Sequence, residues 1–438
     1  MSGSLLPFAV LLLAADPAVL DEGRGGWDQW RGPTRDGRTA VTLPTSLDEA
    51  TLKEAWRVEL GASYSGPVVG PAPADENGNR GSRVYTTETI GNTYESAKAF
   101  DAATGELLWE AKWKGALSVP FFAKANGDWI RSTPALSVDE NGDGLLYVAG
   151  MRDVLVALDA ATGEEAWRID FAALAGSDPE AFGHVASPLV FEGAVYAHTI
   201  AGFSKLNADS GEVEWTVLGD ENNSMSGGAF SSPFVTKIAG VAQILVQART
   251  KLCGVNPKDG TILWEQPVEA FRGMNVLTPT VVPVQDDEKA VRLLTSTYGG
   301  GTFLYEVRRT SESGTADDWA VSTVWQNSRQ GYMSSPVVID GFAFQHLKND
   351  RVVCYDLKTG EAAWTSTPFG GYWSMITDGE KILALDADGD LLLLAADATE
   401  LKTLSERHVT DATSWAHVAV APGRIYVRAL DALIAYDF

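Results

Sequence analysis

Histidine is the residue type that most often binds metals and transfers protons, and this chain of 438 residues contains five of them. They are His184, His198, His346, His408 and His417. No two have the spacing that places a pair of imidazoles on one face of a helix, as in H-x-x-x-H or H-E-x-x-H sites. The histidine pattern therefore predicts neither a metal site nor a catalytic site.

Two acidic segments have the composition of calcium-binding loops. Asp139–Gly144 places oxygen-bearing side chains at loop positions 1, 3 and 5 and a glycine at position 6, as an EF-hand loop does. The twelfth position is Gly150, where such a loop needs a glutamate. Asp386–Asp390 is similar but shorter. Aspartate and glycine at these spacings are also typical of hairpin turns, and turns are the structure predicted for both segments.

Cysteine and glycine patterns supply no catalytic motif either. Cys253 and Cys354 lie in separate apolar, strand-like runs, which favours two buried free thiols. The sequence contains no adjacent cysteine pair and no C-x-x-C-H haem motif. No helical pattern follows Gly299–Gly301, so a bulge or turn is predicted there rather than a phosphate-binding loop. No catalytic, cofactor-binding or metal-binding residue is predicted.

The elements that would position a site are set by an internal repeat. Its pattern is a small residue in most copies, any residue, Asp or Asn, three residues, Gly, three residues and Trp. Copies occur at Ala99–Trp109, Ala157–Trp167, Lys205–Trp215, Gly254–Trp264 and Cys354–Trp364. The polar residue and the glycine suit a tight hairpin turn, and the strand that follows carries a Trp that a single hairpin cannot bury. Units stacked around a ring bury every such Trp against a neighbour.

A second landmark marks the start of each unit, a step from Ser or Thr into Pro and aliphatic residues. It occurs at residues 67, 134, 188, 233, 279 and 336, with weaker copies at 375 and 418. The eight starts lie 39 to 67 residues apart. Four-stranded blades of about 40–50 residues, some with insertions, have this spacing. The chain is therefore predicted to be an all-β protein, an eight-bladed β-propeller.

The ring is predicted to close across the two chain termini. The chain ends at Phe438, after the front half of a repeat, and Trp56 near the N-terminus supplies the missing Trp strand. A blade shared by both ends keeps either terminus from fraying. The residues predicted to bury the blades against each other are Trp56, Trp109, Trp167, Trp215, Trp264, Trp325 and Trp364.

The N-terminal segment predicts export. Residues 1–20 contain a short apolar run typical of a signal peptide, residues 21–52 form a leader, and residues 53–438 form one propeller domain. No later apolar run has the length of a transmembrane helix. The net charge of −24 disfavours nucleic acid as a partner. A monomeric protein in the periplasm or outside the cell is predicted.

The repeat unit resembles the pyrroloquinoline quinone (PQQ) repeat, and the segments Trp27–Gly37, Thr413–His417 and Gly423–Arg428 are similar to those of exported PQQ-like propellers. The resemblance covers residues 27–438. It extends to outer-membrane assembly factors of the BamB type and to the propeller of quinoprotein dehydrogenases. Those enzymes use adjacent cysteines, PQQ, and a calcium ion held by Glu, Asn and Asp. This chain lacks the cysteine pair, so no cofactor is expected, with calcium-bound PQQ as the alternative.

Ligand contacts are expected at the funnel mouth of the ring, where the residues just before the inner strands converge. These residues are Tyr64, Arg131, His184, Phe230, Asn275, Tyr332, Trp373 and Trp415. They suit a sugar or a peptide chain, and they suit an inert filling of the channel equally well. The predicted function is a non-catalytic binding or scaffold protein for a protein or extended-peptide partner, as the BamB-type resemblance implies. The alternatives are a PQQ-dependent alcohol or sugar oxidoreductase and a carbohydrate-binding propeller.

Overall fold

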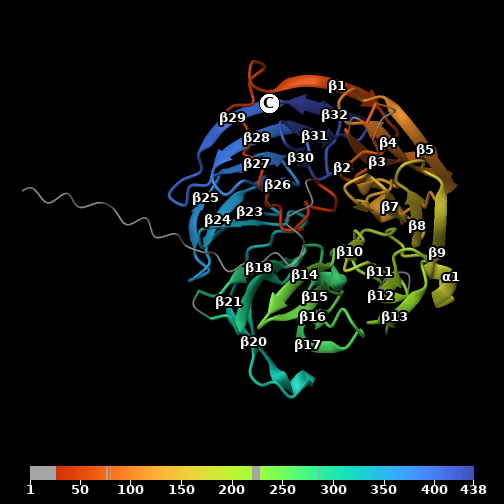
Figure 1. Ribbon diagram of the computed structural model, residues 1–438. Coiled ribbons are helices and arrows are strands. Elements are labelled where there is room, and N and C mark those ends of the chain that lie inside the picture. Colours follow the sequence, from red (N-terminus) through yellow and green to blue (C-terminus); the bar gives the residue numbers. More distant parts are fainter. Residues whose placement is uncertain (1–25, 75–76, 79, 220–226, 286) are drawn as a thin grey trace, which may run out of the picture.

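Eight four-stranded sheets surround a central axis in the computed structural model of the chain (Figure 1). The structure describes residues 26–74, 77–78, 80–219, 227–285 and 287–438, so the predicted signal peptide lies outside the described residues. Within each sheet every neighbouring pair of strands is antiparallel. The eight sheets are the blades of a propeller, which confirms the predicted all-β, eight-bladed architecture.

The first four blades follow one another along the chain. Blade 1 is β2 (Val68–Pro71), β3 (Ser82–Ile90), β4 (Tyr94–Asp101) and β5 (Leu107–Lys114). Blade 2 is β6 (Ala135–Val138), β7 (Gly144–Gly150), β8 (Val154–Asp159) and β9 (Glu165–Asp170). Blade 3 is β10 (Leu189–Phe191), β11 (Ala194–Thr199), β12 (Gly202–Asn207) and β13 (Val213–Val217). Blade 4 is β14 (Phe234–Ile238), β15 (Val241–Gln247), β16 (Lys251–Val255) and β17 (Ile262–Pro267).

The remaining blades complete the ring. Blade 5 is β18 (Thr280–Pro283), β19 (Ala290–Thr297), β20 (Gly301–Arg309) and β21 (Trp319–Asn327). Blade 6 is β22 (Val337–Ile339), β23 (Phe342–His346), β24 (Val352–Asp356) and β25 (Ala362–Thr365). Blade 7 is β26 (Ser374–Thr377), β27 (Lys381–Leu385), β28 (Asp390–Ala395) and β29 (Thr403–His408). Blade 8 is β30 (Ala419–Ala421), β31 (Arg424–Arg428), β32 (Ala432–Asp437) and β1 (Lys53–Glu59).

Blade 8 joins the two ends of the chain. The N-terminal strand β1 pairs antiparallel with the C-terminal strand β32, and Trp56 lies opposite Ala435. In Figure 1 these strands appear as an orange arrow beside a dark blue one. The predicted closure of the ring by its terminal strands is confirmed.

The repeat residues act between blades as well as within them. In blade 1 the Asp101 carboxylate accepts the backbone N–H groups of Ala103 and Thr104 at 3.0 and 2.8 Å, and Gly105 takes a left-handed φ of 75°. A Cβ on Gly105 would lie 2.7 Å from the Trp56 ring of the preceding blade. Trp56 also donates its indole N–H to the Ala102 carbonyl, at 3.1 Å. This turn therefore provides both a contact surface and a hydrogen-bond acceptor for the neighbouring Trp.

The same indole hydrogen bond recurs around the ring. It joins Trp109 to Ala160, Trp167 to Ala208, Trp325 to Leu357 and Trp364 to Asp397, at 2.9 to 3.1 Å. Trp264 is different, because its indole N–H is bonded at 2.7 Å to the side-chain carbonyl of Gln243 in its own blade. All seven predicted Trp residues lie on the outermost strand of a blade.

The outer strand of blade 7 carries no Trp, and the leader packs at that position instead. Ser405 stands next to the β-bulge of β29, where the other outer strands carry Trp. Its hydroxyl accepts the backbone N–H of Leu47 at 2.9 Å, and the Leu47 side chain is fully buried. A Trp at this position would pack against the hairpin turn between the two outer strands of blade 8. Blade 8 has no such turn, because β32 and β1 come from opposite ends of the chain.

The leader also closes one end of the central channel. We call the segment Trp27–Arg38 the plug. Its Trp27 carbonyl accepts the Val69 N–H of blade 1 at 2.8 Å, and the Arg31 guanidinium donates to the Pro336 carbonyl of blade 6 at 2.6 Å. Arg35 donates to carbonyl groups of Ser187, Pro188 and Pro233, just before the inner strands of blades 3 and 4. The plug therefore links blades on opposite sides of the axis.

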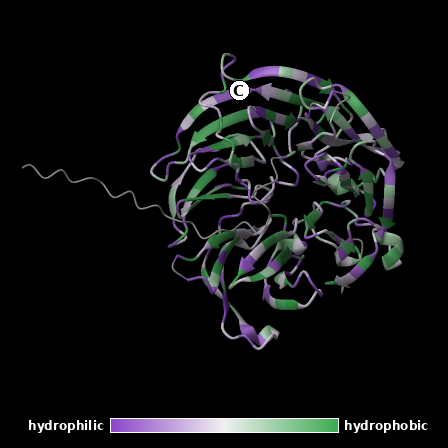
Figure 2. Ribbon diagram, viewed as in Figure 1, coloured by the Kyte–Doolittle hydropathy of each residue, from purple (hydrophilic) through white to green (hydrophobic). Residues whose placement is uncertain are grey.

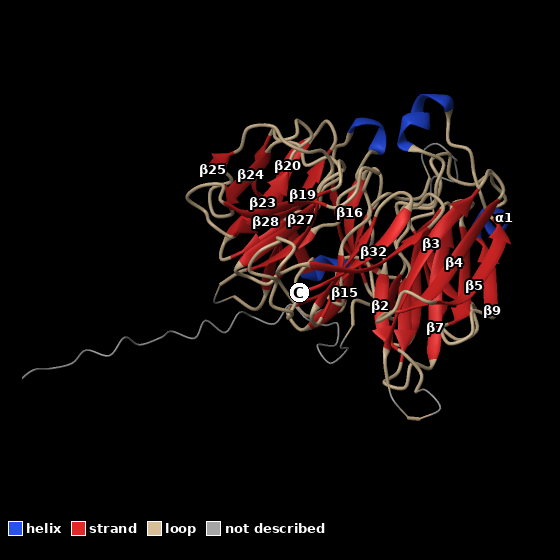
Figure 3. Cartoon of the chain, turned by 90° about the horizontal axis from the view of Figure 1, so that it is seen from above, coloured by secondary structure: helices blue, strands red, loops and turns tan. Residues whose placement is uncertain are grey.

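Loops gather at both ends of the strands (Figure 3). They contain the short helix α1 (Phe171–Ala175) and the 3-10 turns η1 (Phe121–Asn126), η2 (Phe271–Gly273) and η3 (Ala316–Asp318). The outer strands alternate in hydropathy, as expected for a sheet with one face toward a neighbouring blade (Figure 2). Within the described residues, no helix has the length and apolarity needed to cross a membrane.

Candidate ligand-binding cup

The loops that enter the inner strands converge on a cavity of about 430 Å³ at one end of the ring. We call this cavity the cup. Six of the predicted funnel-mouth residues line it: Tyr64, Arg131, Phe230, Tyr332, Trp373 and Trp415. Trp30, from the plug, also lines the cup and forms its floor. The cup is therefore open at one end only.

Two of the predicted funnel-mouth residues lie behind the wall instead. Asn275 is buried, and its side-chain amide donates to the carbonyls of Ala248 and Arg249, both at 3.0 Å. His184 is also buried and is hydrogen-bonded within the loop. Their apolar neighbours Val185, Met274 and Val276 line the cup in their place. The hydrogen bonds donated by the Asn275 amide nitrogen and by His184 Nε2 hold these two polar side chains away from the cavity.

Aromatic rings form a connected arc around one side of the cup. Tyr64 stacks on Trp415 with ring centroids 4.5 Å apart, and Trp415 contacts Tyr372 at 4.6 Å. The arc continues from Tyr372 to Tyr332 at 5.8 Å and from Tyr332 to Tyr298 at 5.2 Å. Tyr298 and Tyr372 were not predicted from the sequence. Tyr298 follows β19 and does not precede an inner strand, and Tyr372 is the neighbour of the predicted Trp373, two residues before β26.

A second aromatic arc lies across the cup. Phe122 contacts Phe182 at 6.1 Å, and Phe182 contacts Phe230 at 5.9 Å. The Arg249 guanidinium lies 4.1 Å from the centre of the Phe230 ring, a cation–π distance. Phe122 is 56% exposed, so the apolar surface of the cup continues onto its rim.

The charged groups of the cup are all cations. Arg131 donates from Nε to the Trp129 carbonyl at 3.2 Å and from Nη2 to the Gly127 carbonyl at 2.8 Å. Burial lowers the pKa of Arg131 to about 10, although nearby Tyr64 and Asp128 oppose the shift. Arg249 and Arg272 are further lining residues, and the described residues of the wall include no Asp or Glu. The wall therefore combines aromatic surface with positive charge.

The floor adds two more cations beneath Trp30. The guanidinium groups of Arg31 and Arg35 lie 5.5 and 5.8 Å from the centre of the Trp30 ring. Both side chains are fully buried, and burial lowers the pKa of Arg31 to about 10 and that of Arg35 to about 9. Neither arginine forms an ion pair with a described carboxylate within 4.0 Å. Nearby Asp36 opposes the pKa shift of Arg31, and nearby Asp28 opposes that of Arg35.

Comparisons with known proteins agree with this architecture. Residues 93–366 match the family described as outer membrane protein assembly factor BamB, which is more than half of the chain. The chain belongs to this family. It is 25% identical over 333 residues to the outer membrane protein assembly factor BamB of Moranella endobia (strain PCIT), which covers 74% of this chain and 75% of that protein.

Solved structures share the fold of this BamB-family chain at low sequence identity. BamB from Moraxella catarrhalis superposes with a TM-score of 0.54 at 15% identity, over 88% of this chain and 98% of that one. A europium-containing methanol dehydrogenase superposes with a TM-score of 0.53 at 10% identity, over 96% of this chain and 99% of that one. The same ring therefore occurs in assembly factors and in a dehydrogenase, and the side chains of the cup must distinguish between them.

The cup of this BamB-family chain does not fit a calcium–PQQ centre. Calcium binds six to eight oxygen ligands and relies on carboxylates, but the described wall offers only hydroxyl, amide and backbone oxygens. Cys253 and Cys354 lie in β16 and β24 of different blades and are buried free thiols, as predicted. Burial raises the pKa of each thiol to about 12. No quinone chemistry is therefore assigned to the cup.

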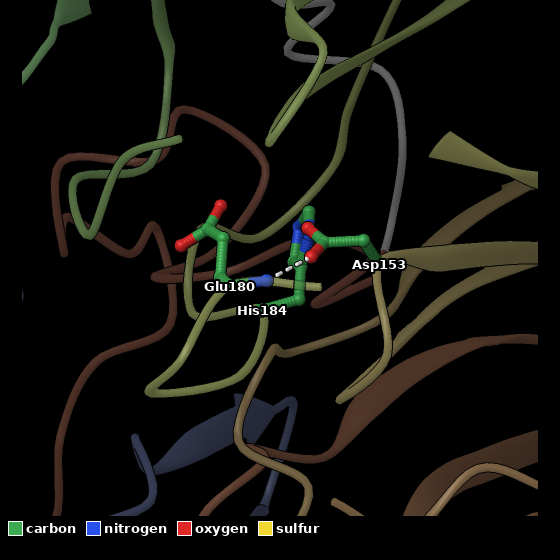
Figure 4. A group of neighbouring side chains, drawn as sticks. All are labelled: Asp153, Glu180 and His184. Atoms are coloured by element: carbon green, nitrogen blue, oxygen red, sulfur yellow. Dashed lines mark hydrogen bonds and ion pairs between the residues drawn. The ribbon is translucent and has the colours of Figure 1, made fainter. Parts of the chain in front are cut away.

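The most compact group of potential metal ligands lies behind the cup wall, in blade 2 and the loop after it (Figure 4). One ligand atom each from Asp153, Glu180 and His184 lies within 4.8 Å of the others, and all three residues are buried. The sequence did not predict this group, because Asp153 is distant from the other two and the spacing of Glu180 and His184 matches no metal motif.

Hydrogen bonds to the backbone already use ligand atoms of Asp153 and His184 in this group. Asp153 accepts the N–H of Glu180 at 2.6 Å, which is the dashed contact in Figure 4, and its other oxygen lies 3.3 Å from His184 Nδ1. His184 Nε2 donates to the Ala186 carbonyl at 2.8 Å. Burial, reinforced by Asp153, raises the pKa of Glu180 well above its usual value, and a protonated carboxyl is a poor metal ligand. The group ties the loop to the β7–β8 hairpin.

The two predicted calcium-like segments form hairpin turns. Asp139 accepts the N–H groups of Asn141 and Asp143 at 2.7 and 3.1 Å, and Asp386 accepts those of Asp388 and Asp390 at 3.0 and 2.9 Å. Burial raises the pKa of Asp386 to about 6. Each carboxylate is thus used to shape its own turn.

Proposed function

We propose that this protein is a non-catalytic, monomeric propeller of the cell envelope that binds other proteins through extended peptide segments. The observation that carries the proposal is the cup, whose aromatic walls hold only positive charge and no carboxylate among the described residues. Acid–base and metal-assisted mechanisms need a carboxylate or a histidine placed to react. His417 is the histidine of the described lining, and burial lowers its pKa to about 3, so it is a weak base. An aromatic wall with a few hydrogen-bonding groups is instead typical of a binding site.

The family adds support for a protein partner. The curated relatives are named outer membrane protein assembly factors, and the short apolar run within residues 1–20 is consistent with an exported protein. The net charge of −24 repels the phosphate backbone and so disfavours nucleic acid as a partner. A periplasmic or extracellular location is part of the proposal.

Carbohydrate binding is the second candidate. The stacked pair of Tyr64 and Trp415 offers the flat aromatic surface that sugar rings also contact. The lack of a wall carboxylate among the described residues removes a common sugar-hydroxyl acceptor and favours the peptide.

A binding panel on the mature protein tests the proposal. The probes are an array of unstructured 15-residue peptides, a series of neutral and acidic oligosaccharides, and PQQ with calcium. We expect saturable peptide binding that is lost in the double variant Tyr332→Ala, Trp415→Ala. It should remain in the control Leu107→Ala, an exposed apolar residue of β5 outside the cup. Saturable PQQ binding with dye-linked alcohol oxidation would contradict the proposal.

A further inference from the structure

The plug determines what kind of ligand the cup can take. Trp30 forms the floor, and the plug around it is bonded to the inner strands through Gln29, Arg31 and Arg35. A peptide cannot pass through a channel that is closed at one end. A peptide that fills the cup must therefore enter with one of its ends.

Charge determines which end enters. The chain carries a net charge of −24, yet the cup has Arg131 and Arg272 in its wall and Arg31 and Arg35 beneath its floor. No Asp or Glu lines the cup among the described residues, and the carboxylates nearest to these arginines, Asp28, Asp36 and Asp128, lie outside the lining. A cleft lined by charge of one sign concentrates the field of that charge inside it. A terminal carboxylate is attracted to this field, and a terminal ammonium group is repelled.

Arg131 is held ready to bind such a carboxylate. Its Nε and Nη2 atoms donate to the carbonyls of Trp129 and Gly127, which fixes the plane of the guanidinium. Nη1 makes no hydrogen bond with the described residues. A guanidinium fixed in this way loses little freedom when it bonds an anion. The ring of Tyr64, which also lines the cup, adds an apolar side to the same corner.

The walls select the residues that precede the carboxylate. The arc from Tyr64 through Trp415, Tyr372 and Tyr332 offers ring faces and edges, with tyrosine hydroxyls and one indole N–H as its polar groups. Apolar and aromatic side chains gain most from this surface. The cavity volume of about 430 Å³ falls in the range of small-ligand sites, so it holds a short chain end and not a folded domain.

We propose that the cup captures the C-terminal carboxylate of extended peptides whose last residues are apolar or aromatic, with Arg131 binding the carboxylate. This inference rests on the proposed function, since it assumes that the partner is a protein. It goes further by naming the part of the partner that is recognised. Capture of a terminal carboxylate is a known mode of peptide recognition.

Calorimetry with two peptides tests the proposal. The probes are acetyl-Gly-Ser-Gly-Leu-Trp with a free carboxylate and the same peptide with a C-terminal amide. We expect the acid to bind at least about tenfold more tightly than the amide. Arg131→Gln should reduce the affinity for the acid to that for the amide and leave amide binding unchanged. The control Arg168→Gln, which removes an exposed cation on β9, should leave both affinities unchanged.

The wild-type comparison of acid with amide needs no variant, so a folding defect in Arg131→Gln cannot obscure the result. If the acid and the amide bind with equal affinity and Trp415→Ala abolishes both, carboxylate capture is overturned, whereas the proposed peptide-binding function still holds. Binding of trigalacturonate but of neither peptide would overturn both proposals in favour of an acidic carbohydrate. A preference for the acid that Arg131→Gln leaves unchanged would overturn the role of Arg131.

Discussion

Trp109 lies against Gly163 of the next blade, where a Cβ would come within 2.6 Å of the indole ring. Corresponding contacts join Trp56 to Gly105, Trp167 to Gly211, Trp215 to Gly260 and Trp325 to Gly360. Each of these glycines also has a positive φ of 72 to 76°. Glycine is thus required twice at the same position, once by the backbone conformation and once by the close approach of the ring.

The two requirements can be separated by a matched pair of substitutions. Gly341 has a φ of 81° but no atom within 4 Å of its Cβ position, whereas Gly163 has a φ of 76° and the Trp109 contact. Gly341→Ala should lower the free energy of unfolding by about 1 kcal/mol through conformation alone. Gly163→Ala should cost at least about 1 kcal/mol more. Equal losses in chemical denaturation would show that the ring contact is unimportant.

Glu95 introduces a pH dependence into the stability of blades 1 and 2. Its buried carboxylate accepts the Met151 N–H at 2.9 Å and the Trp113 indole N–H at 3.1 Å. Burial raises the pKa of Glu95 to about 7 from 4.5, although these hydrogen bonds oppose the shift. A carboxyl with a raised folded-state pKa contributes stability that is complete below about pH 4.5 and is lost as the pH rises through 7.

Glu95→Gln should therefore flatten the stability profile between pH 5 and pH 8. Relative to the variant, the wild type should lose about 1.4 kcal/mol of unfolding free energy for each unit by which the pH rises between about 5 and about 7. Thermal unfolding midpoints across this range would measure the difference, with the exposed turn residue Glu106→Gln as the control. Parallel profiles for wild type and Glu95→Gln would contradict the assignment.

At the scale of elements, the leader is as much a part of the ring as any blade strand. Leu43, Leu47 and Leu52 are buried in the same apolar cluster as residues of blades 7 and 8. The leader fills the position where blade 7 has Ser405 instead of Trp. A segment that follows directly on a predicted signal peptide thus completes the packing of the last two blades.

Leu47→Ala tests this role. Removing a fully buried leucine should lower the free energy of unfolding by about 2–4 kcal/mol, as in other cores. Leu404→Ala, on the neighbouring strand β29 and 42% exposed, should change it by less than about 0.5 kcal/mol. Unfolding in denaturant would compare the two. A negligible effect of Leu47→Ala would mean that the leader does not support blades 7 and 8.

The eight blades and the closure of the ring were predictable because the blades repeat the same turn and Trp residues along the sequence. The Asp–Gly turn and the Trp are side-chain signals, and so is the unfinished repeat before Phe438. The plug was not predictable, because its arginines bind backbone carbonyls such as that of Pro336, which leave no mark on the sequence. For the cup, the register identified six of the lining residues, but hydrogen bonds that form only in the folded chain hold the His184 and Asn275 side chains out of the cavity.

At the scale of the whole molecule, the charge of the surface opposes the charge of the cup. A net charge of −24 repels an anionic peptide at long range, while the arginines of the cup attract it at short range. Salt screens exposed and distant charges more than partly buried ones, over a Debye length of about 8–10 Å near physiological ionic strength.

Association of the acid peptide should therefore become faster with added salt. Raising sodium chloride from about 20 to about 150 mM should increase the association rate severalfold, since it removes the long-range repulsion first. Stopped-flow measurements that follow tryptophan fluorescence would give the rate, and the amide peptide should respond less. A rate that falls with salt would indicate that the cup, not the outer surface, governs the approach.

The joining of both termini in blade 8 has a consequence for how the molecule matures. Arg31 reaches Pro336 across 305 positions, and Arg428 reaches Gly61 across 367, so these contacts form only when most of the chain is available. Folds dominated by such distant pairings form slowly. While the chain is still being synthesised, β1 lacks its partner strand β32. The ring closes only when β32 has been synthesised. A chain that stops before Ala432 leaves β1 with an unpaired strand edge.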